Sequence, residues 1–370
     1  MLVPGLRAQT TYSGSAGAAA MFKRICQGLT ALLAVALVAS PASAAQQGNV
    51  TGSPATATGN RAAPHASTRK IALGVSMLPF ADQNTYDSFT AATGRPPAVW
   101  SIWADWADST SAFPTALVNR LKQGHSVPLI IWQPVGAGKP PGHSGSPGLE
   151  ESCGVDYSKI IGGDWDTYIR SWATAAIGKG PILMRFAHEM DGGWFPFGFT
   201  RCQNSAAKFK TMWKHVVTIF RSAGATNVKF VWSPLKANTH AKQLYPGNAW
   251  VDYVGVSSFN WASAHHAPWQ SLVTVVKHFT DGLMSYASSK PWILAETGSV
   301  PSEHGHSRAS WLTSGYKALY SQIPNIKAIV YFNIDMRSIS DQPNWTLTPG
   351  ADINAYKSLL QNSHFQGKVS

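Results

Sequence analysis

Acidic residues are scarce in this sequence of 370 residues. It holds 18 Asp and Glu against 30 Lys and Arg, and charged residues make up only 13% of it. Six of the basic residues but none of the acidic ones precede residue 71, so 24 basic residues accompany 18 acidic ones in the rest of the chain. That mild excess, without runs of Lys and Arg, argues against a nucleic-acid binder. The hydrophobic fraction of 44% excludes a disordered chain.

Long apolar runs are missing as well. The apolar stretch over 29–39 follows two basic residues and is too short to span a bilayer. An Ala-Ser-Ala cleavage site at 42–44 completes the pattern of a secretory signal. We therefore predict that residues 1–44 are an N-terminal extension and signal peptide, with Met21 as the true start. The product is expected to be secreted, extracellular or periplasmic, and free of the membrane after cleavage; an uncleaved anchor is the alternative.

Cysteines are few, and only three occur in the chain. One leaves with the predicted signal peptide, so Cys153 and Cys202 remain. An even pair in an oxidising compartment indicates a disulfide, and two unrelated thiols are the alternative. Residues 45–69 are small, polar and aperiodic, which predicts a flexible linker before the remaining domain at 70–370.

Eight runs of β-branched and aromatic residues recur in that domain, each followed by a helical pattern. They cover residues 71–78, 98–103, 126–134, 181–189, 227–234, 251–260, 291–299 and 326–335. Near-continuous apolar runs indicate strands buried on both faces, as in a parallel sheet. The pattern predicts an α/β fold, a (β/α)8 TIM barrel forming a single catalytic domain. One helix is expected to begin at Asp164 as its N-cap, and the Gly/Pro-rich stretch 137–152 is expected to be a surface loop at the rim.

Only five glutamates occur, and two of them fall where predicted strands end. Glu189 ends the fourth strand and Glu296 lies in the seventh, whereas Glu150, Glu151 and Glu303 fall in predicted loops. In a TIM barrel the chemistry takes place at the carboxyl ends of the strands. Hydrolysis of a glycosidic bond needs two carboxyl groups, so the pair points to a glycosidase. The alternative is that each glutamate forms a structural ion pair, for which Arg185 is available.

Tryptophan is abundant, with 15 residues. Five lie at or just beyond predicted strand ends and are expected to meet on one face: Trp103, Trp132, Trp194, Trp232 and Trp261. Sugar rings stack on such aromatic planes, while their hydroxyls need polar partners such as Gln133, His188 and Asn260. Three others in predicted helices are expected to fill the core: Trp172, Trp213 and Trp311.

Motifs for metal, nucleotide or acyl-transfer chemistry are lacking. The pair His188-Glu189 begins like the zinc motif H-E-x-x-H, but Gly192 occupies the position of the second histidine. We therefore expect no cofactor and no metal.

The segment RFAHEMDGGWFPFG at 185–198 resembles the acid/base segment of glycoside hydrolase family 26, the family of β-mannanases and some β-1,3-1,4-glucanases and β-1,3-xylanases. ILAETGS at 293–299 is similar to the nucleophile strand of that family. Further similarity spans most of 70–350: 228–234, 251–261, 330–335 and 344–345. The resemblance implies that Glu189 is the general acid/base and Glu296 the nucleophile of a retaining mechanism.

The resemblance also implies that His188 and Trp194 line the subsite of the sugar being cleaved. The full set of candidate substrate-binding residues is His188, Trp194, Trp132, Gln133, Phe259, Asn260, Trp261 and Tyr331. Three of them depart from the family pattern. Phe259 stands where a tyrosine commonly binds the nucleophile carboxylate, Gln133 where glutamate is frequent, and Tyr331 where a tryptophan platform is expected.

The sequence therefore predicts a secreted, monomeric endo-β-glycanase acting on a polysaccharide. The backbone stays open among β-1,4-mannan, a related glucan or xylan, and an exopolysaccharide of the producer. Two alternatives are a carbohydrate-binding barrel that does not cut its ligand, and a retaining β-glycosidase of another family.

Overall fold

The computed structural model describes residues 69–107, 111–136, 148–337 and 342–369. The predicted signal peptide, the predicted linker up to residue 68 and the larger part of the 137–152 loop lie outside the described residues. Within the described ranges, no helix has the length and apolar character needed to cross a membrane.

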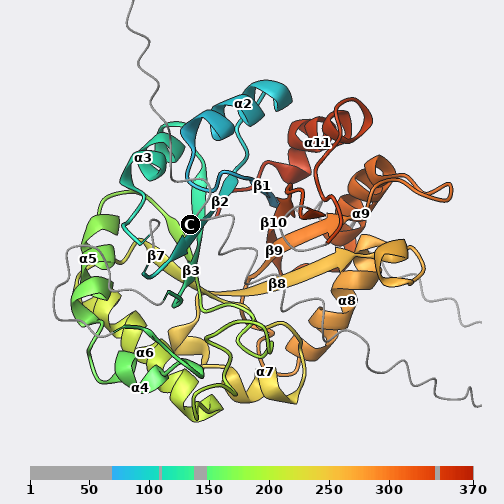
Figure 1. The fold of residues 1–370 in the computed structure, drawn as a ribbon. Helices are drawn as coiled ribbons and strands as arrows, with labels where there is room; N and C mark the ends of the chain where they lie inside the picture. Colours follow the sequence, from blue (N-terminus) through green and yellow to red (C-terminus); the bar gives the residue numbers. More distant parts are fainter. Residues whose placement is uncertain (1–68, 108–110, 137–147, 338–341, 370) are drawn as a thin grey trace, which may run out of the picture.

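Eight parallel strands close into a barrel at the centre of the molecule (Figure 1). In barrel order they are β1 (Ala72–Ser76), β2 (Val99–Asp105), β3 (Val127–Gln133), β6 (Ile182–Phe186), β7 (Val228–Trp232), β8 (Tyr253–Asn260), β9 (Trp292–Ser299) and β10 (Ile326–Phe332). The ring closes where β10 pairs with β1, for example Val330 with Gly74. All eight predicted strands are present, which confirms the (β/α)8 fold.

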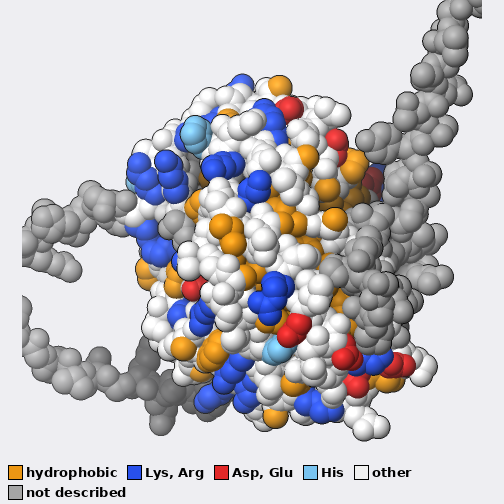
Figure 2. Space-filling view, turned by 90° about the vertical axis from the view of Figure 1, so that its left-hand side faces the viewer, with side chains coloured by type: hydrophobic (Ala, Val, Ile, Leu, Met, Phe, Trp, Pro, Cys, Tyr) orange, Lys and Arg blue, Asp and Glu red, His pale blue; other side chains and the backbone are white. Residues whose placement is uncertain are grey.

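Helices surround the barrel on its outside (Figure 1). They are α2 (Gln83–Thr93), α3 (Thr115–Gln123), α4 (Tyr157–Ile161), α5 (Asp166–Ala176), α6 (Ala206–Ser222), α7 (Thr239–Leu244), α8 (Leu272–Leu283), α9 (Arg308–Gln322) and α11 (Ala351–Gln361). Three short 3-10 helices are η1 (Asn248–Trp250), η2 (Ala262–His265) and η3 (Ser363–Phe365). On the face over α3 and α5, basic side chains are scattered and form no single patch (Figure 2).

The helix whose N-cap was expected at Asp164 has its N-cap one residue later. Trp165 is the N-cap of α5 and is buried in the core, and no side chain caps the helix. Asp166 lies in the first turn, where a negative charge favours the helix dipole, and its carboxylate lies 2.6 Å from Nε2 of His215 on α6. The N-cap role expected of Asp164 is therefore wrong.

The core has two layers because successive side chains of a strand point to opposite faces. Along β3, Leu129 and Ile131 belong to clusters inside the barrel, whereas Ile130 and Trp132 belong to the layer between strands and helices. The three helical tryptophans predicted to fill the core do so in this outer layer: Trp172, Trp213 and Trp311. This alternation decides which strand-end residues face the site.

Candidate active site

A cavity of about 610 Å³ opens at the carboxyl ends of the barrel strands. Residues from or just after β2, β6, β7, β8, β9 and β10 line it, together with residues of α8 and of the segment around Trp345. Glu189 and Glu296 both line this cavity, so the two glutamates that the sequence singled out share one site.

The backbone around Glu189 turns sharply after β6. Ala187 and Glu189 have positive φ angles of 42° and 51°, a region that residues with a β-carbon rarely adopt. Hydrogen bonds hold the turn: Ala187 N–H donates to Trp132 O at 3.1 Å, and Glu189 N–H donates to Ser233 O at 2.7 Å. Such strain persists only where neighbouring contacts impose it, and it occurs frequently at active sites. Here it directs the Glu189 side chain into the cavity.

Glu296 lies on β9 and is held by two buried partners. Arg185 Nη1 forms an ion pair with Glu296 Oε2 at 3.0 Å, and Ser257 Oγ donates a hydrogen bond to the same oxygen at 3.2 Å. Arg185 Nη2 in turn donates to Ser257 Oγ at 2.7 Å and lies 3.8 Å from Glu189 Oε1. One guanidinium therefore serves both carboxylates. Oε1 of Glu296 is buried and has no hydrogen-bond partner among the described residues.

The environment of Glu189 favours its protonated form. Burial raises the pKa of Glu189 to about 7, and the nearby charge of Glu296 adds to the rise, while Arg185 opposes it. A carboxyl with a pKa near neutrality can both donate and accept a proton at that pH. The two carboxyls differ in their contact with Arg185, because Glu296 Oε2 lies 3.0 Å from its guanidinium and Glu189 Oε1 lies 3.8 Å away.

His188 lies between these groups and an aromatic cluster. It is 1% exposed, and its ring meets Trp103 and Phe195 edge to face, with centroids 5.6 and 4.8 Å away. Burial, together with the charge of Arg185, lowers the pKa of His188 well below its usual value, so the imidazole is neutral. Its Nδ1 atom has no hydrogen-bond partner among the described residues, although the residue lines the cavity. A neutral imidazole there can bind a sugar hydroxyl.

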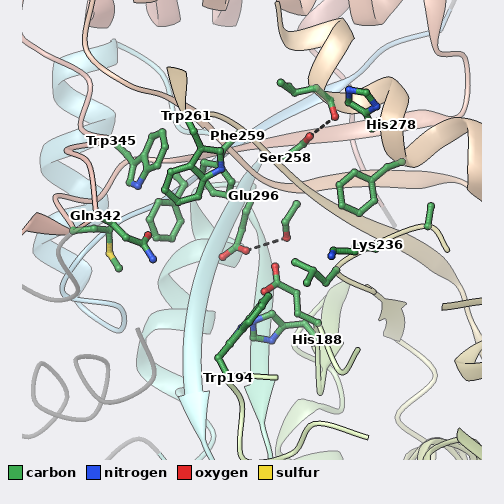
Figure 3. A pocket seen from close by; sticks show the side chains of 18 of the residues that line it. His188, Trp194, Lys236, Ser258, Phe259, Trp261, His278, Glu296, Gln342 and Trp345 are labelled. Atoms are coloured by element: carbon green, nitrogen blue, oxygen red, sulfur yellow. Dashed lines mark hydrogen bonds between the residues drawn. The ribbon is translucent and has the colours of Figure 1, made fainter. Parts of the chain in front are cut away.

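Aromatic side chains form one wall of the cavity. Trp345 lies 4.9 Å from both Phe259 and Trp261, ring centroid to centroid, and Figure 3 shows the three grouped on the same side of Glu296. Trp103, Trp194 and Phe332 also line the cavity. Of the candidate substrate-binding residues, four therefore lie at the cavity: His188, Trp194, Phe259 and Trp261.

Two of the tryptophans expected at the rim are instead fully buried. Trp132 and Trp232 are 0% exposed and belong to the layer between barrel and helices, where Trp132 stacks against Tyr168. The alternation of side chains along β10 has the same effect on Tyr331. This residue points outward and donates a hydrogen bond to Trp345 O at 2.9 Å. The next residue, Phe332, lines the cavity. The expectation that Trp132 and Tyr331 contact substrate is therefore wrong.

Two polar candidates form hydrogen bonds within the fold and do not reach the cavity. Gln133 is 1% exposed and donates a hydrogen bond to Asp105 on the neighbouring strand at 2.8 Å. Asn260 donates to Ser299 Oγ at 3.0 Å and accepts the backbone N–H of Gln270 at 2.9 Å. Neither lines the cavity. Each side chain forms hydrogen bonds with a neighbouring strand or loop instead. The expectation that Gln133 and Asn260 bind substrate is therefore wrong.

The structure adds site residues that sequence reasoning missed. Trp345 was part of the family resemblance but not a site candidate, and Ser257 carries no motif of its own. Lys236, which follows β7, and His278, on α8, also line the cavity. Lys236 and His278 are single exposed residues of common types, so no sequence motif marks them as site residues.

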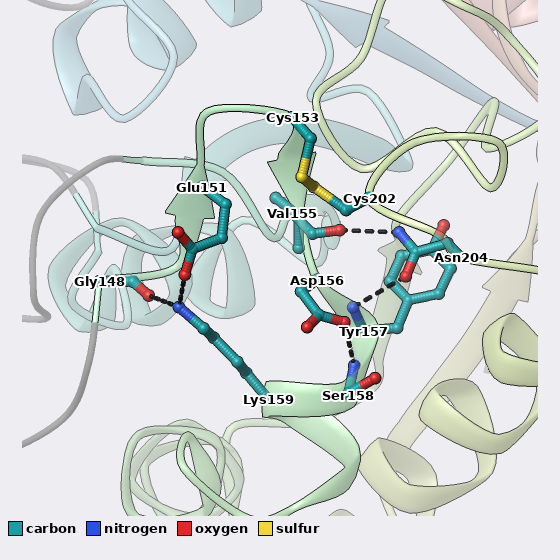
Figure 4. The surroundings of a disulfide bond; sticks show 10 residues. All are labelled: Gly148, Glu151, Cys153, Val155, Asp156, Tyr157, Ser158, Lys159, Cys202 and Asn204. Atoms are coloured by element: carbon teal, nitrogen blue, oxygen red, sulfur yellow. Dashed lines mark hydrogen bonds and ion pairs between the residues drawn. A yellow bond between two sulfur atoms is a disulfide. The ribbon is translucent and has the colours of Figure 1, made fainter.

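Cys153 and Cys202 form the predicted disulfide, with Cα atoms 5.0 Å apart (Figure 4). The bond joins the small antiparallel sheet of β4 (Glu150–Glu151) and β5 (Gly154–Val155) to the segment that follows Glu189. Nearby, Asn204 Nδ2 donates to Val155 O at 2.7 Å, and Lys159 forms an ion pair with Glu151. The segment that follows Glu189 is thus tied covalently to a loop beside it. Glu151, predicted in a loop, lies in β4.

Metal-binding chemistry finds no support within the described ranges. No group of three or more His, Cys, Asp or Glu there has the arrangement of a metal site.

The fold and this cavity define a TIM barrel with two carboxylates at the carboxyl ends of its strands. Residues 148–297, which include both glutamates, match the family model "Glycosyl hydrolase family 26". The resemblance seen in the sequence is thereby confirmed over these residues.

Two curated relatives are similar to parts of the chain. Endoglucanase H of Acetivibrio thermocellus is 33% identical over 184 residues, which is 47% of this chain and 20% of that protein. A mannan endo-1,4-β-mannosidase of Bifidobacterium adolescentis is 31% identical over 85 residues, which is 22% of this chain and 8% of that protein. The chain thus spans a fifth or less of the length of these relatives.

Solved structures share the fold. A GH26 β-mannanase from Bacteroides ovatus aligns with a TM-score of 0.55 and 16% identity over 80% of this chain and 90% of that one. A modular endo-β-1,4-mannanase from Cellulomonas fimi aligns with a TM-score of 0.56 and 17% identity over 81% of this chain and 73% of that one. At these identities the likeness supports the barrel alone.

Proposed function

We propose that the protein is a retaining endo-β-glycanase that hydrolyses β-1,4-mannan or a related β-glucan or xylan. The observation that carries the proposal is the pair Glu189 and Glu296 in one cavity, with unequal environments. Burial and the neighbouring charge raise the pKa of Glu189 to about 7, whereas Glu296 has the closer contact with Arg185, at 3.0 Å. Two carboxyl groups with separated roles are what double displacement requires.

In the first step, an oxygen of Glu296 attacks the anomeric carbon while Glu189 gives its proton to the glycosidic oxygen. The bond from the anomeric carbon to that oxygen breaks, and the sugar is left as an ester on Glu296. In the second step, the Glu189 carboxylate takes a proton from water as the water oxygen attacks the same carbon. Glu296 leaves as a carboxylate and the anomeric configuration is retained.

Neighbouring residues support both steps. Arg185 and Ser257 hold Oε2 of Glu296, whereas Oε1 has no hydrogen-bond partner among the described residues. The neutral His188 and the wall of Phe259, Trp261 and Trp345 provide a hydroxyl partner and stacking surfaces for sugar rings. The presence of both glutamates argues against the alternative of a binding protein without activity.

Secretion and a monomeric state belong to the same proposal. The signal-like stretch up to residue 44 and the disulfide between Cys153 and Cys202 both suit an oxidising compartment. Expression with the natural N-terminus, followed by mass determination of the exported product, tests the cleavage site. Light scattering on that product tests the monomer.

The decisive experiment is a reducing-sugar assay on a panel of mannan, mixed-linkage glucan and xylan, with product lengths. We expect oligosaccharides of several lengths from one polymer, and their absence with Glu296→Gln as control. If wild type binds a polymer but releases no reducing ends from any of them, the carbohydrate-binding alternative replaces the enzyme. Proton NMR of the first products gives the stereochemistry, and an inverted product would rule out the nucleophile role of Glu296.

A further inference from the structure

The wall of the cavity opposite the aromatic one carries basic and polar side chains. Lys236 and Asn238 follow β7, and His278 lies on α8; all three line the cavity. In Figure 3, Lys236 and His278 lie on one side of Glu296, and Trp261 and Trp345 on the other. We call the set Lys236, Asn238 and His278 the basic wall. The two walls therefore suit sugars of different chemistry.

Hydrogen bonds fix the backbone of Lys236 relative to the catalytic segment. Asp191 Oδ1 accepts the N–H of Leu235 at 2.6 Å, and Asp191 Oδ2 accepts the N–H of Lys236 at 3.1 Å. Asp191 is two residues beyond Glu189, so the base of the lysine is tied to the acid/base turn. Both carboxylate oxygens of Asp191 are thus engaged with the backbone.

The loop after β7 approaches α8 closely, and this approach brings His278 of the basic wall near Lys236. A β-carbon at Gly282 would lie 2.3 Å from Ala237 O, so only glycine permits this approach. His278 lies one turn before Gly282 on α8 and therefore shares its helix face. The loop that carries Lys236 and the helix face that carries His278 are thus held against each other.

The charge of Lys236 has no close partner in the part of the chain that the structure describes. Burial raises the pKa of the Asp191 carboxyl, and the charge of Lys236 opposes that rise, but no carboxylate in the described ranges lies within ion-pair distance of Lys236 Nζ. The other carboxylates of the cavity are Glu189 and Glu296, and Arg185 already serves both. A neutral mannan, glucan or xylan offers hydroxyl groups to this ammonium but no opposite charge.

We propose that the basic wall binds the carboxylate of a uronic acid residue, so that the substrate is an acidic β-glycan with a uronate near the bond that is cut. The ammonium of Lys236 pairs with the carboxylate, while Asn238 and the His278 imidazole donate hydrogen bonds to it or to the adjacent hydroxyls. The inference rests on the proposed glycanase function and specifies its substrate class.

The test compares each acidic polysaccharide with its own carboxyl-reduced form, in which an uncharged hydroxymethyl group replaces each carboxylate. The probes are deacylated gellan, glucuronoxylan and poly-β-mannuronate, whose reduction yields β-1,4-mannan. We expect wild type to cut at least one acidic form with a kcat/KM about fivefold above the reduced form, mainly through KM. Because Lys236 is exposed, that ratio is expected to shrink in 0.5 M NaCl.

Variants attribute the preference to the basic wall. Lys236→Met is expected to bring the ratio of acidic to reduced substrate near one, and Lys236→Arg to keep it. Lys242→Met is the matched control, since this exposed lysine of α7 does not line the cavity. A wild type that cuts both forms equally, or a Lys236→Met variant that keeps the full ratio, overturns the inference.

A binding assay separates this inference from the catalytic proposal. Affinity electrophoresis of Glu296→Gln in gels that contain the acidic or the reduced polymer needs no hydrolysis. If the variant is retarded more by an acidic polymer while wild type cuts nothing, the uronate site stands and the glycanase proposal fails. If wild type cuts neutral polymers and Glu296→Gln shows no preference for acidic ones, the uronate site fails and the glycanase proposal stands. Absence of both binding and cleavage rejects both.

Discussion

Arg185 Nη1 lies 3.0 Å from Glu296 Oε2, and both side chains are buried inside the carboxyl end of the barrel. The same guanidinium lies 3.8 Å from Glu189 Oε1. The sequence suggested that a glutamate of this barrel would be either structural, paired with Arg185, or catalytic. The ion pair is compatible with the catalytic role that we propose, because the guanidinium compensates two carboxylates that otherwise repel each other in a buried cavity.

Removal of this cation should destabilise the fold and change the titration of the site. Arg185→Met leaves two buried carboxylates without a counter-charge, so we expect a loss of about 3–5 kcal/mol in unfolding free energy. Because Arg185 lowers the pKa of Glu189, the basic limb of the pH profile of kcat/KM should move to higher pH. Arg308→Met is the matched control: Arg308 is equally buried and pairs with Asp352, away from Glu189. It should lower the melting temperature and leave the basic limb in place.

The two glutamates should fail differently when mutated. Glu296→Ala removes the attacking group, so hydrolysis should stop whatever the leaving group. Glu189→Ala should still form the glycosyl-enzyme on an aryl glycoside, whose leaving group needs little protonation. Stopped-flow measurement should then show a burst followed by slow turnover.

Azide distinguishes the roles further. It needs no general base, so with Glu189→Ala it should restore turnover and give a glycosyl azide of retained configuration. With Glu296→Ala the azide product should be inverted. Wild-type hydrolysis by both variants would exclude a catalytic role for either residue.

The raised pKa of Glu189 makes stability depend on pH. Between the unperturbed pKa of 4.5 and the folded value of about 7, the folded protein holds a proton that the unfolded chain has released. Unfolding free energy therefore falls as pH rises through this window, by up to about 3 kcal/mol. Glu189→Gln should flatten the fall and be more stable than wild type at pH 8 but not at pH 4. Urea denaturation at both pH values measures this, and equal slopes for the two proteins would contradict it.

Two tryptophans of similar burial should have different consequences. Trp345 lines the cavity and Trp132 does not, although they are 1% and 0% exposed. Trp345→Phe should raise KM severalfold because the stacking surface shrinks. Trp132→Phe should lower the melting temperature and leave KM unchanged. A rise in KM for Trp132→Phe alone would refute the assignment of these faces.

The disulfide should contribute to stability through loop closure. The bond between Cys153 and Cys202 spans 49 residues, for which the chain-entropy model gives about 4 kcal/mol. Cys153→Ser together with Cys202→Ser should lower the melting temperature markedly. Dithiothreitol should lower it for wild type and leave the double variant unchanged. A response of the double variant to the reductant would show that the effect lies elsewhere.

Local pattern was sufficient to predict the barrel and the two glutamates. Buried parallel strands produce apolar runs that are visible along the chain, and a residue at the end of such a run must reach the carboxyl-end face. The scarcity of glutamate made Glu189 and Glu296 stand out, and the even number of cysteines pointed to the bond between Cys153 and Cys202.

Tertiary packing decided which strand-end side chains face the cavity. Neighbouring residues of a strand point to opposite faces, as Ile131 and Trp132 do on β3 and Tyr331 and Phe332 do on β10. The residue types at a strand end do not show which of two neighbours will face the cavity.

The electrostatics of the site also arise from closure. Arg185 meets Glu296, and Lys236 comes close to the face of α8, only when the strands are wound into a ring. Charges far apart along the chain acquire shifted pKa values through burial and proximity, and both depend on the three-dimensional arrangement.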